Sequence, residues 1–92
     1  MITIHKFPVS IQDVQEANIR GMTRLLDINY QDGDLCIWAL VDTDALFSRE
    51  FKLRIVGTGH IFDDYYDWSY WKTVFVGPLV WHVYVNMGHL LA

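Results

Sequence analysis

Residues 31–42, with the sequence QDGDLCIWALVD, decide the fold class of this chain. The Asp32-Gly33 pair is typical of a tight hairpin turn, because the central positions of such a turn need positive φ values. The next eight residues, 35–42, are apolar on both faces of an extended chain, which predicts a central strand covered on each side. Within this strand we expect Cys36 to be a small buried hydrophobe and Trp38 to lie in the core. The stretch therefore predicts a β protein.

Alternation of apolar and polar residues with a period of two predicts further strands on both sides of this one. They cover residues 2–7, 22–30, 50–56, 68–76 and 79–86. We expect the first to end at Pro8 and the last two to form a hairpin across Gly77-Pro78. In the strand at 22–30 we expect an apolar inner face formed by Met22, Leu26, Ile28 and Tyr30. In the strand at 50–56 we expect Phe51, Leu53 and Ile55 to face inward, and Lys52 and Arg54 to face outward.

Residues 11–20 are ambiguous, because helical spacing places Ile11, Val14 and Ala17 on one face while a short irregular strand fits as well. The predicted fold is all-β, a small antiparallel sandwich or barrel of about six strands. The alternative is α+β with one short helix at 11–20. We expect residues 1–92 to form a single domain and the tail from residue 87 to fray.

Composition limits the class of function. The 92 residues are 52% hydrophobic and 15% aromatic, more than a small core needs, which indicates exposed aromatic side chains and a partner or a homo-oligomer. Seven basic and eleven acidic residues give a net charge of −4, which argues against direct nucleic-acid binding. One cysteine favours an intracellular setting. The first residues do not resemble a signal peptide, and no apolar run reaches the roughly 18 residues that a membrane span needs.

The segment Gly57-Thr58-Gly59-His60 resembles a ligand loop, but a phosphate cradle needs a helix after its glycines, and acidic residues follow here. We interpret it as a turn that leaves a strand. A metal site built from His60, Asp63, Asp64 and Asp67 is the alternative for the loop, although the spacing matches no established metal motif. A pair of Cys36 and His82 would need an exposed thiolate, and Cys36 lies in an apolar run. We therefore predict no catalytic residue, no metal and no cofactor.

The acidic and aromatic loop before the 68–76 strand is the predicted partner-binding site. Tyrosine and tryptophan are common anchors of protein interfaces, and carboxylates beside them suit a basic partner. The predicted site residues are His60, Asp63, Asp64, Tyr65, Tyr66, Asp67 and Trp68. Plain core packing and a homo-oligomer interface are the alternatives for these aromatic residues.

The segments LCIWALVD, FKLRIVGTGH and VGPLVWHVYV, in this order, resemble a family of short uncharacterised phage and prophage proteins. The resemblance covers residues 2–8 and 24–85, whereas segment 11–23 departs from it and the loop DDYYDWSYW is more aromatic. The family has no known function, so no site residue carries over. The resemblance implies a phage protein in the host bacterial cytoplasm.

This setting and the predicted loop lead to a functional hypothesis. The protein is expected to be a non-enzymatic binder of a host protein, with an anti-phage defence factor such as a CRISPR effector or a restriction enzyme as the target. The target surface would be a basic, nucleic-acid-binding one, which the acidic loop residues could occupy. A sponge for a nucleotide signal and a minor virion or assembly component are the alternatives.

Overall fold

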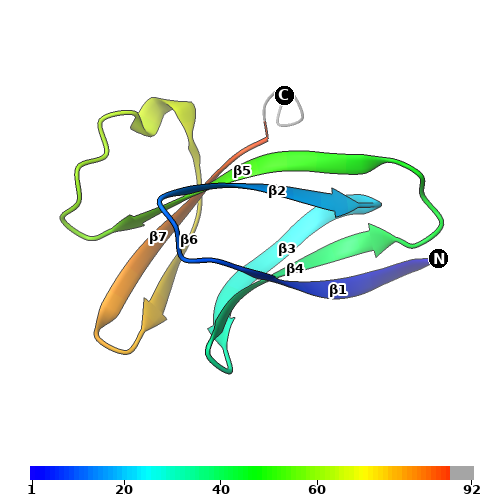
Figure 1. The fold of residues 1–92 in the computed structure, drawn as a ribbon, viewed down its shortest axis with the longest axis horizontal. Helices are drawn as coiled ribbons and strands as arrows, with labels where there is room; N and C mark the ends of the chain where they lie inside the picture. Colours follow the sequence, from blue (N-terminus) through cyan, green and yellow to red (C-terminus); the bar gives the residue numbers. More distant parts are fainter. Residues whose placement is uncertain (88–92) are drawn as a thin grey trace. The chain divides into compact units, whose positions relative to one another are not determined.

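The computed structural model describes residues 1–87, which form seven strands and one short 3-10 helix (Figure 1). The all-β class and the antiparallel pairing are confirmed, and the helix at 11–20 is wrong. The tail from residue 88 onward lies outside the described residues. The elements are β1 (Ile2–Val9), β2 (Val14–Arg20), β3 (Met22–Gln31), β4 (Asp34–Asp42), β5 (Ser48–Gly57), η1 (Tyr65–Asp67), β6 (Ser69–Val76) and β7 (Leu79–Asn86).

The chain divides into two compact units, and β2 and β5 each run from one into the other. The first unit comprises Met1–Ser10 and Asn18–Glu50 and contains a three-stranded sheet in the order β1-β4-β3. The central position of β4 is confirmed, and its residues Leu35, Ile37, Ala39 and Val41 are buried along one face. Trp38 alternates onto the opposite face and is only half-buried, so its prediction as a core residue is wrong.

Strand β3 carries two irregularities in its pairing with β4, between Met22 and Arg24 and between Leu25 and Asp27. Each extra residue shifts the alternation of side chains by one position. Leu25 therefore pairs with Ala39, while Leu26 is 39% exposed. The prediction that Leu26 shares the inner face is wrong for this reason, since a regular alternation does not hold across a bulge.

The turn between β3 and β4 and the end of β1 test two further predictions in the first unit. The predicted hairpin turn is confirmed, with φ of 52° at Asp32 and 90° at Gly33. Strand β1 does not end at Pro8 but continues to Val9, and Pro8 pairs with Cys36. A proline is tolerated there because β1 is an edge strand, whose outward amide positions need no partner.

The second unit, Ile11–Ala17 with the chain from Phe51 onward, contains most of a four-stranded sheet in the order β2-β5-β7-β6. The inner face of β5 is confirmed, because Phe51, Leu53 and Ile55 are at most 4% exposed. The β6–β7 hairpin across Gly77-Pro78 is also confirmed. Neither sheet closes on itself, since each has two edge strands.

Strand β2 shows why the helical interpretation of residues 11–20 failed. Its exposed and covered positions alternate with a period of two, and Ile19 is buried. Ile11 and Val14, which the helical spacing placed on an apolar face, are 43% and 45% exposed. The amide of Ile55 donates to the carbonyl oxygen of Asp13 at 3.0 Å, at the start of β2, so pairing with β5 decides the conformation.

Candidate functional site

One face of the four-stranded sheet carries the side chains that form the candidate site. Arg54 of β5, Tyr84 of β7 and Tyr70 of β6 lie side by side in the pairing register, and Val56, His82 and Thr73 form the next row. We call this surface the Tyr84 face. Its members alternate along three strands: Lys52, Arg54 and Val56 in β5; Val80, His82, Tyr84 and Asn86 in β7; and Tyr70, Thr73 and Phe75 in β6.

The loop of residues 58–68 leaves β5 through the Gly57–His60 segment. The amide of His60 donates to the carbonyl oxygen of Gly57 at 3.0 Å, and Gly59 has a φ of 88°. A Cβ on Gly57 would come within 2.8 Å of the His60 ring, whose centroid lies 6.5 Å from that of Trp81. The interpretation of this segment as a turn is confirmed. No helix follows it to complete a phosphate cradle, only the 3-10 turn η1.

Arg54 fastens the loop to the sheet. Its Nη1 lies 2.8 Å from Asp13 Oδ1, and its Nη2 lies 3.3 Å from Asp64 Oδ1. The guanidinium carbon also lies 5.2 Å from the ring centroid of Phe62, a cation–π geometry. The Arg54 side chain is 12% exposed, against 77% for Asp13 and 47% for Asp64. A single arginine of β5 therefore holds the segment before β2 and the loop before β6.

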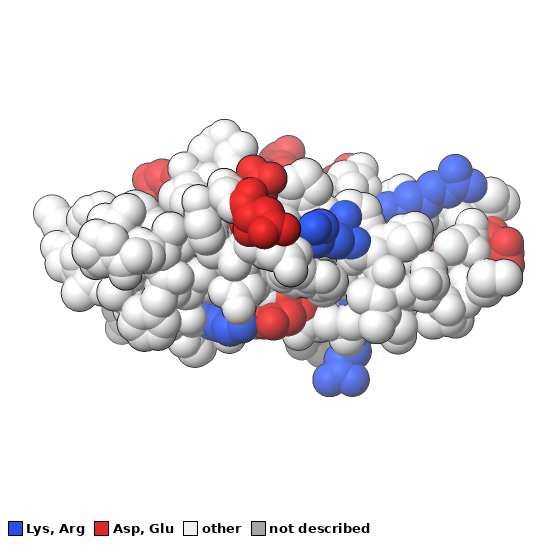
Figure 2. All heavy atoms as spheres, turned by 90° about the horizontal axis from the view of Figure 1, so that it is seen from below, with Lys and Arg blue, Asp and Glu red and all other residues white. Residues whose placement is uncertain are grey.

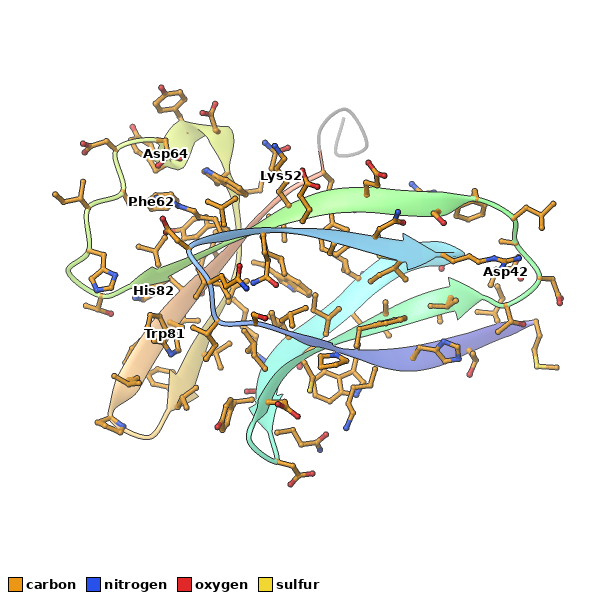
Figure 3. All side chains as sticks on the ribbon, in the orientation of Figure 1. Asp42, Lys52, Phe62, Asp64, Trp81 and His82 are labelled. Carbon is orange, nitrogen blue, oxygen red and sulfur yellow. The ribbon has the colours of Figure 1, made fainter. Side chains whose placement is uncertain are left out.

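Further contacts fix the far part of the loop. Trp68 Nε1 donates to Asp64 Oδ2 at 3.1 Å, and Asn86 Nδ2 donates to the carbonyl oxygen of Asp67 at 3.1 Å. Phe62 packs edge-on against Tyr84 of the sheet, with ring centroids 4.8 Å apart. Figure 3 shows Phe62 and Asp64 on the loop, with His82 and Trp81 on β7. The loop is thus held by side chains along its length, which limits the conformations that it can adopt.

Between these anchor points the loop exposes two tyrosines. Tyr65 and Tyr66 are 64% and 75% exposed, and their rings meet edge to face at 5.8 Å. Asp63 and Asp67, on either side of the pair, are also exposed. The structure therefore divides the seven predicted site residues. Asp64, Trp68 and His60 support the loop, and the other four form an exposed set that we call the loop tip: Asp63, Tyr65, Tyr66 and Asp67.

Cys36 and His82, considered above as a nucleophile and its base, each contact other groups. Within residues 1–87, no group of three or more His, Cys, Asp or Glu side chains is placed to hold a metal ion. The Sγ of the buried Cys36 lies 3.7 Å from the carbonyl oxygen of Asp34. Both ring nitrogens of His82 meet threonine hydroxyls instead: Thr58 Oγ1 lies 2.8 Å from Nε2, and Thr73 Oγ1 lies 3.0 Å from Nδ1.

The Arg54 clamp and the His82 contacts were missed by the sequence reasoning. Both join residues that are far apart in the chain, so spacing carries no signal for them. The outward position of Arg54 on β5 and the acidic loop that follows were visible. Their pairing becomes evident only when the loop folds back over the strand.

Figure 2 shows a face on which acidic and basic side chains lie interspersed among uncharged ones. A basic stripe of the kind that binds a nucleic-acid backbone does not cover that face. Within residues 1–87, no helix is long and apolar enough to cross a membrane.

These observations define a small all-β protein with an aromatic and acidic loop anchored on one sheet face. The chain belongs to the family described as a domain of unknown function, DUF7352, which matches residues 1–89. The expected membership of an uncharacterised family is thereby confirmed. Comparison with curated proteins finds no match, and neither does comparison with solved structures.

Proposed function

We propose that this is a phage-encoded, non-enzymatic binding protein that uses the loop tip to bind a protein of the bacterial host. One observation carries the proposal: two adjacent tyrosines, 64% and 75% exposed, stand on a loop that is already fastened to the sheet. Large exposed aromatic side chains are costly to leave in water and are the usual hot spots of interfaces. Because the loop is anchored in advance, less ordering entropy opposes binding.

The chemistry of the tip favours a basic partner surface. Carboxylates of Asp63 and Asp67 flank the tyrosines, and both side chains are exposed. Arginine on a partner forms charge-assisted hydrogen bonds with carboxylates and stacks on aromatic rings. A host defence protein with a nucleic-acid channel, such as a CRISPR effector, presents such a surface. The phage setting and the host cytoplasm are supported by the sequence resemblance described above.

The test is capture of host proteins from a bacterial lysate by the tagged chain, compared with its Tyr65→Ala/Tyr66→Ala variant. Loss of the two hot-spot rings is expected to weaken binding about 30-fold or more, equivalent to about 2 kcal/mol. The fold is expected to survive, because η1 contains no buried residue. Tyr30→Ala is the matched control, since Tyr30 is a tyrosine of β3, 38% exposed, outside both the loop and the Tyr84 face.

Each outcome of this experiment has a meaning. One host protein that binds the parent chain and the Tyr30→Ala control but not the double variant supports the proposal. Equal capture by all three chains contradicts the role of the loop tip. A nucleotide retained without any protein would favour the signal sponge, although Arg54, one of the arginines that would hold its phosphates, is already paired with two carboxylates. Recovery of the chain alone, as a defined oligomer, would favour an assembly role.

A further inference from the structure

A second polar cluster lies on the Tyr84 face, outside the loop tip. Four side chains form a hydrogen-bonded series across the sheet, from Thr58 to His82, Thr73 and Tyr70. The separations are 2.8 Å for Thr58 Oγ1 to His82 Nε2, 3.0 Å for His82 Nδ1 to Thr73 Oγ1, and 2.7 Å for Thr73 Oγ1 to the Tyr70 hydroxyl. Thr58 and Tyr70, the two ends of the series, are exposed.

The direction of the hydrogen bonds in this series is reversible. A neutral imidazole donates from one nitrogen and accepts at the other, and each hydroxyl can do both. When Thr58 donates to His82, the proton of the Tyr70 hydroxyl is free at the other end. When Tyr70 donates to Thr73, the reversed series leaves the Thr58 hydroxyl proton free. In either direction the surface presents one donor at one end and lone pairs at the other.

Aromatic rings flank this polar centre. Tyr70 is 58% exposed and meets Tyr84 edge to face, with ring centroids 5.4 Å apart. Phe75, opposite Val80 in the register, is 70% exposed on the same face. Tyr70 pairs with Tyr84 and Phe75 with Val80, four residues apart along β7, so the backbone positions of these two rows lie about 13 Å apart along the sheet. The row of His82 and Thr73 lies between these two rows in the register.

We infer that this part of the Tyr84 face binds a carbohydrate. A sugar hydroxyl is both donor and acceptor, and so it matches a series whose ends exchange these roles. A phosphate only accepts and an ammonium only donates, so each of these could use only one end. The apolar C–H face of a sugar ring packs against an exposed aromatic ring, and a few polar groups among aromatic walls are the usual composition of a ligand site.

The test is titration of the isotope-labelled chain with the methyl glycosides of glucose, galactose, mannose and N-acetylglucosamine, followed by NMR. One sugar unit on an open face is expected to bind with a dissociation constant on the order of 1 mM. Saturable shifts are expected at Tyr70, Thr73, Phe75 and His82 for at least one of the four. If none of the four glycosides produces saturable shifts at these residues, the inference is wrong.

Variants separate this site from the loop tip. Tyr70→Ala is expected to weaken sugar binding about tenfold or more through loss of the ring. Tyr70→Phe and Thr58→Val keep the shape and remove one hydroxyl each, so both should retain weakened binding. Tyr30→Ala, an exposed tyrosine of β3, is the control and should bind like the parent chain. Sugar binding that survives Tyr70→Ala unchanged would overturn the assignment, whereas the Tyr65→Ala/Tyr66→Ala variant should keep it.

Discussion

Replacement of Arg54 by methionine tests whether one arginine holds the loop to the sheet. Each of its two ion pairs has an exposed carboxylate, and such pairs contribute about 0.2–1 kcal/mol. The cation–π contact with Phe62 contributes about 0.5–2 kcal/mol, toward the upper end because the arginine is 12% exposed. Part of this gain is offset, since Arg54 Nε is buried without a hydrogen-bond partner among the described residues.

We therefore expect Arg54→Met to lower the free energy of unfolding by about 2 kcal/mol, which corresponds to a fall in Tm of roughly 8–16 °C for a domain of this size. Urea denaturation measures the change directly, with an unchanged m-value. Lys52→Met is the matched control, because Lys52 lies two residues away on the same face of β5 and is exposed. Its expected effect is within about 0.5 kcal/mol. If the two variants lose equally little stability, Arg54 does not hold the loop.

The same clamp predicts an effect on function. Arg54→Met keeps the Tyr65 and Tyr66 side chains but removes the contacts that hold their loop on the sheet. Binding of the host partner in the capture assay should therefore weaken. Asp64→Asn should destabilise the protein more than Asp13→Asn, because Asp64 also accepts a hydrogen bond from Trp68 and is less exposed than Asp13.

Two further predictions concern the first unit. Gly21→Ala should lower the free energy of unfolding, measured by urea denaturation, far more than Gly33→Ala does. Both glycines have positive φ, but a Cβ on Gly21 would lie against the Asp42 carbonyl oxygen, whereas a Cβ on Gly33 would meet open space. Equal effects of the two substitutions would contradict the packing at Gly21. The pKa of the Met1 amine is raised above its ordinary value of 8.0, chiefly by its hydrogen bond with Asp44 and also by Asp42. Because the folded-state pKa is the higher one, this stabilisation is complete below about pH 8 and is lost as pH rises through the raised value. An NMR titration of Met1 should show the raised pKa, and Asp44→Asn should bring it down.

Much of the strand pattern could be predicted because apolar alternation records which side of each strand faces away from water. Phe51, Leu53 and Ile55 followed that rule. The turn at Asp32-Gly33 could be predicted because these residue types tolerate the positive φ values that the turn requires. Leu26 broke the rule, because a bulge in β3 depends on the partner strand and leaves no periodic signal. Residues 11–20 were ambiguous for a similar reason, since pairing with β5 and not local preference made them a strand.

For the site, the sequence by itself determined that an acidic, aromatic loop follows β5. Only the tertiary structure decided which loop residues hold the loop on the sheet and which are exposed at its tip. Asp64 and Asp63 are adjacent and chemically alike, yet one is paired with Arg54 and Trp68 while the other is exposed. The Thr58–His82–Thr73–Tyr70 series likewise arises from strand register, which brings together hydroxyls and an imidazole that are distant in the chain. Such contacts depend on distance in space, which the order of residues does not record.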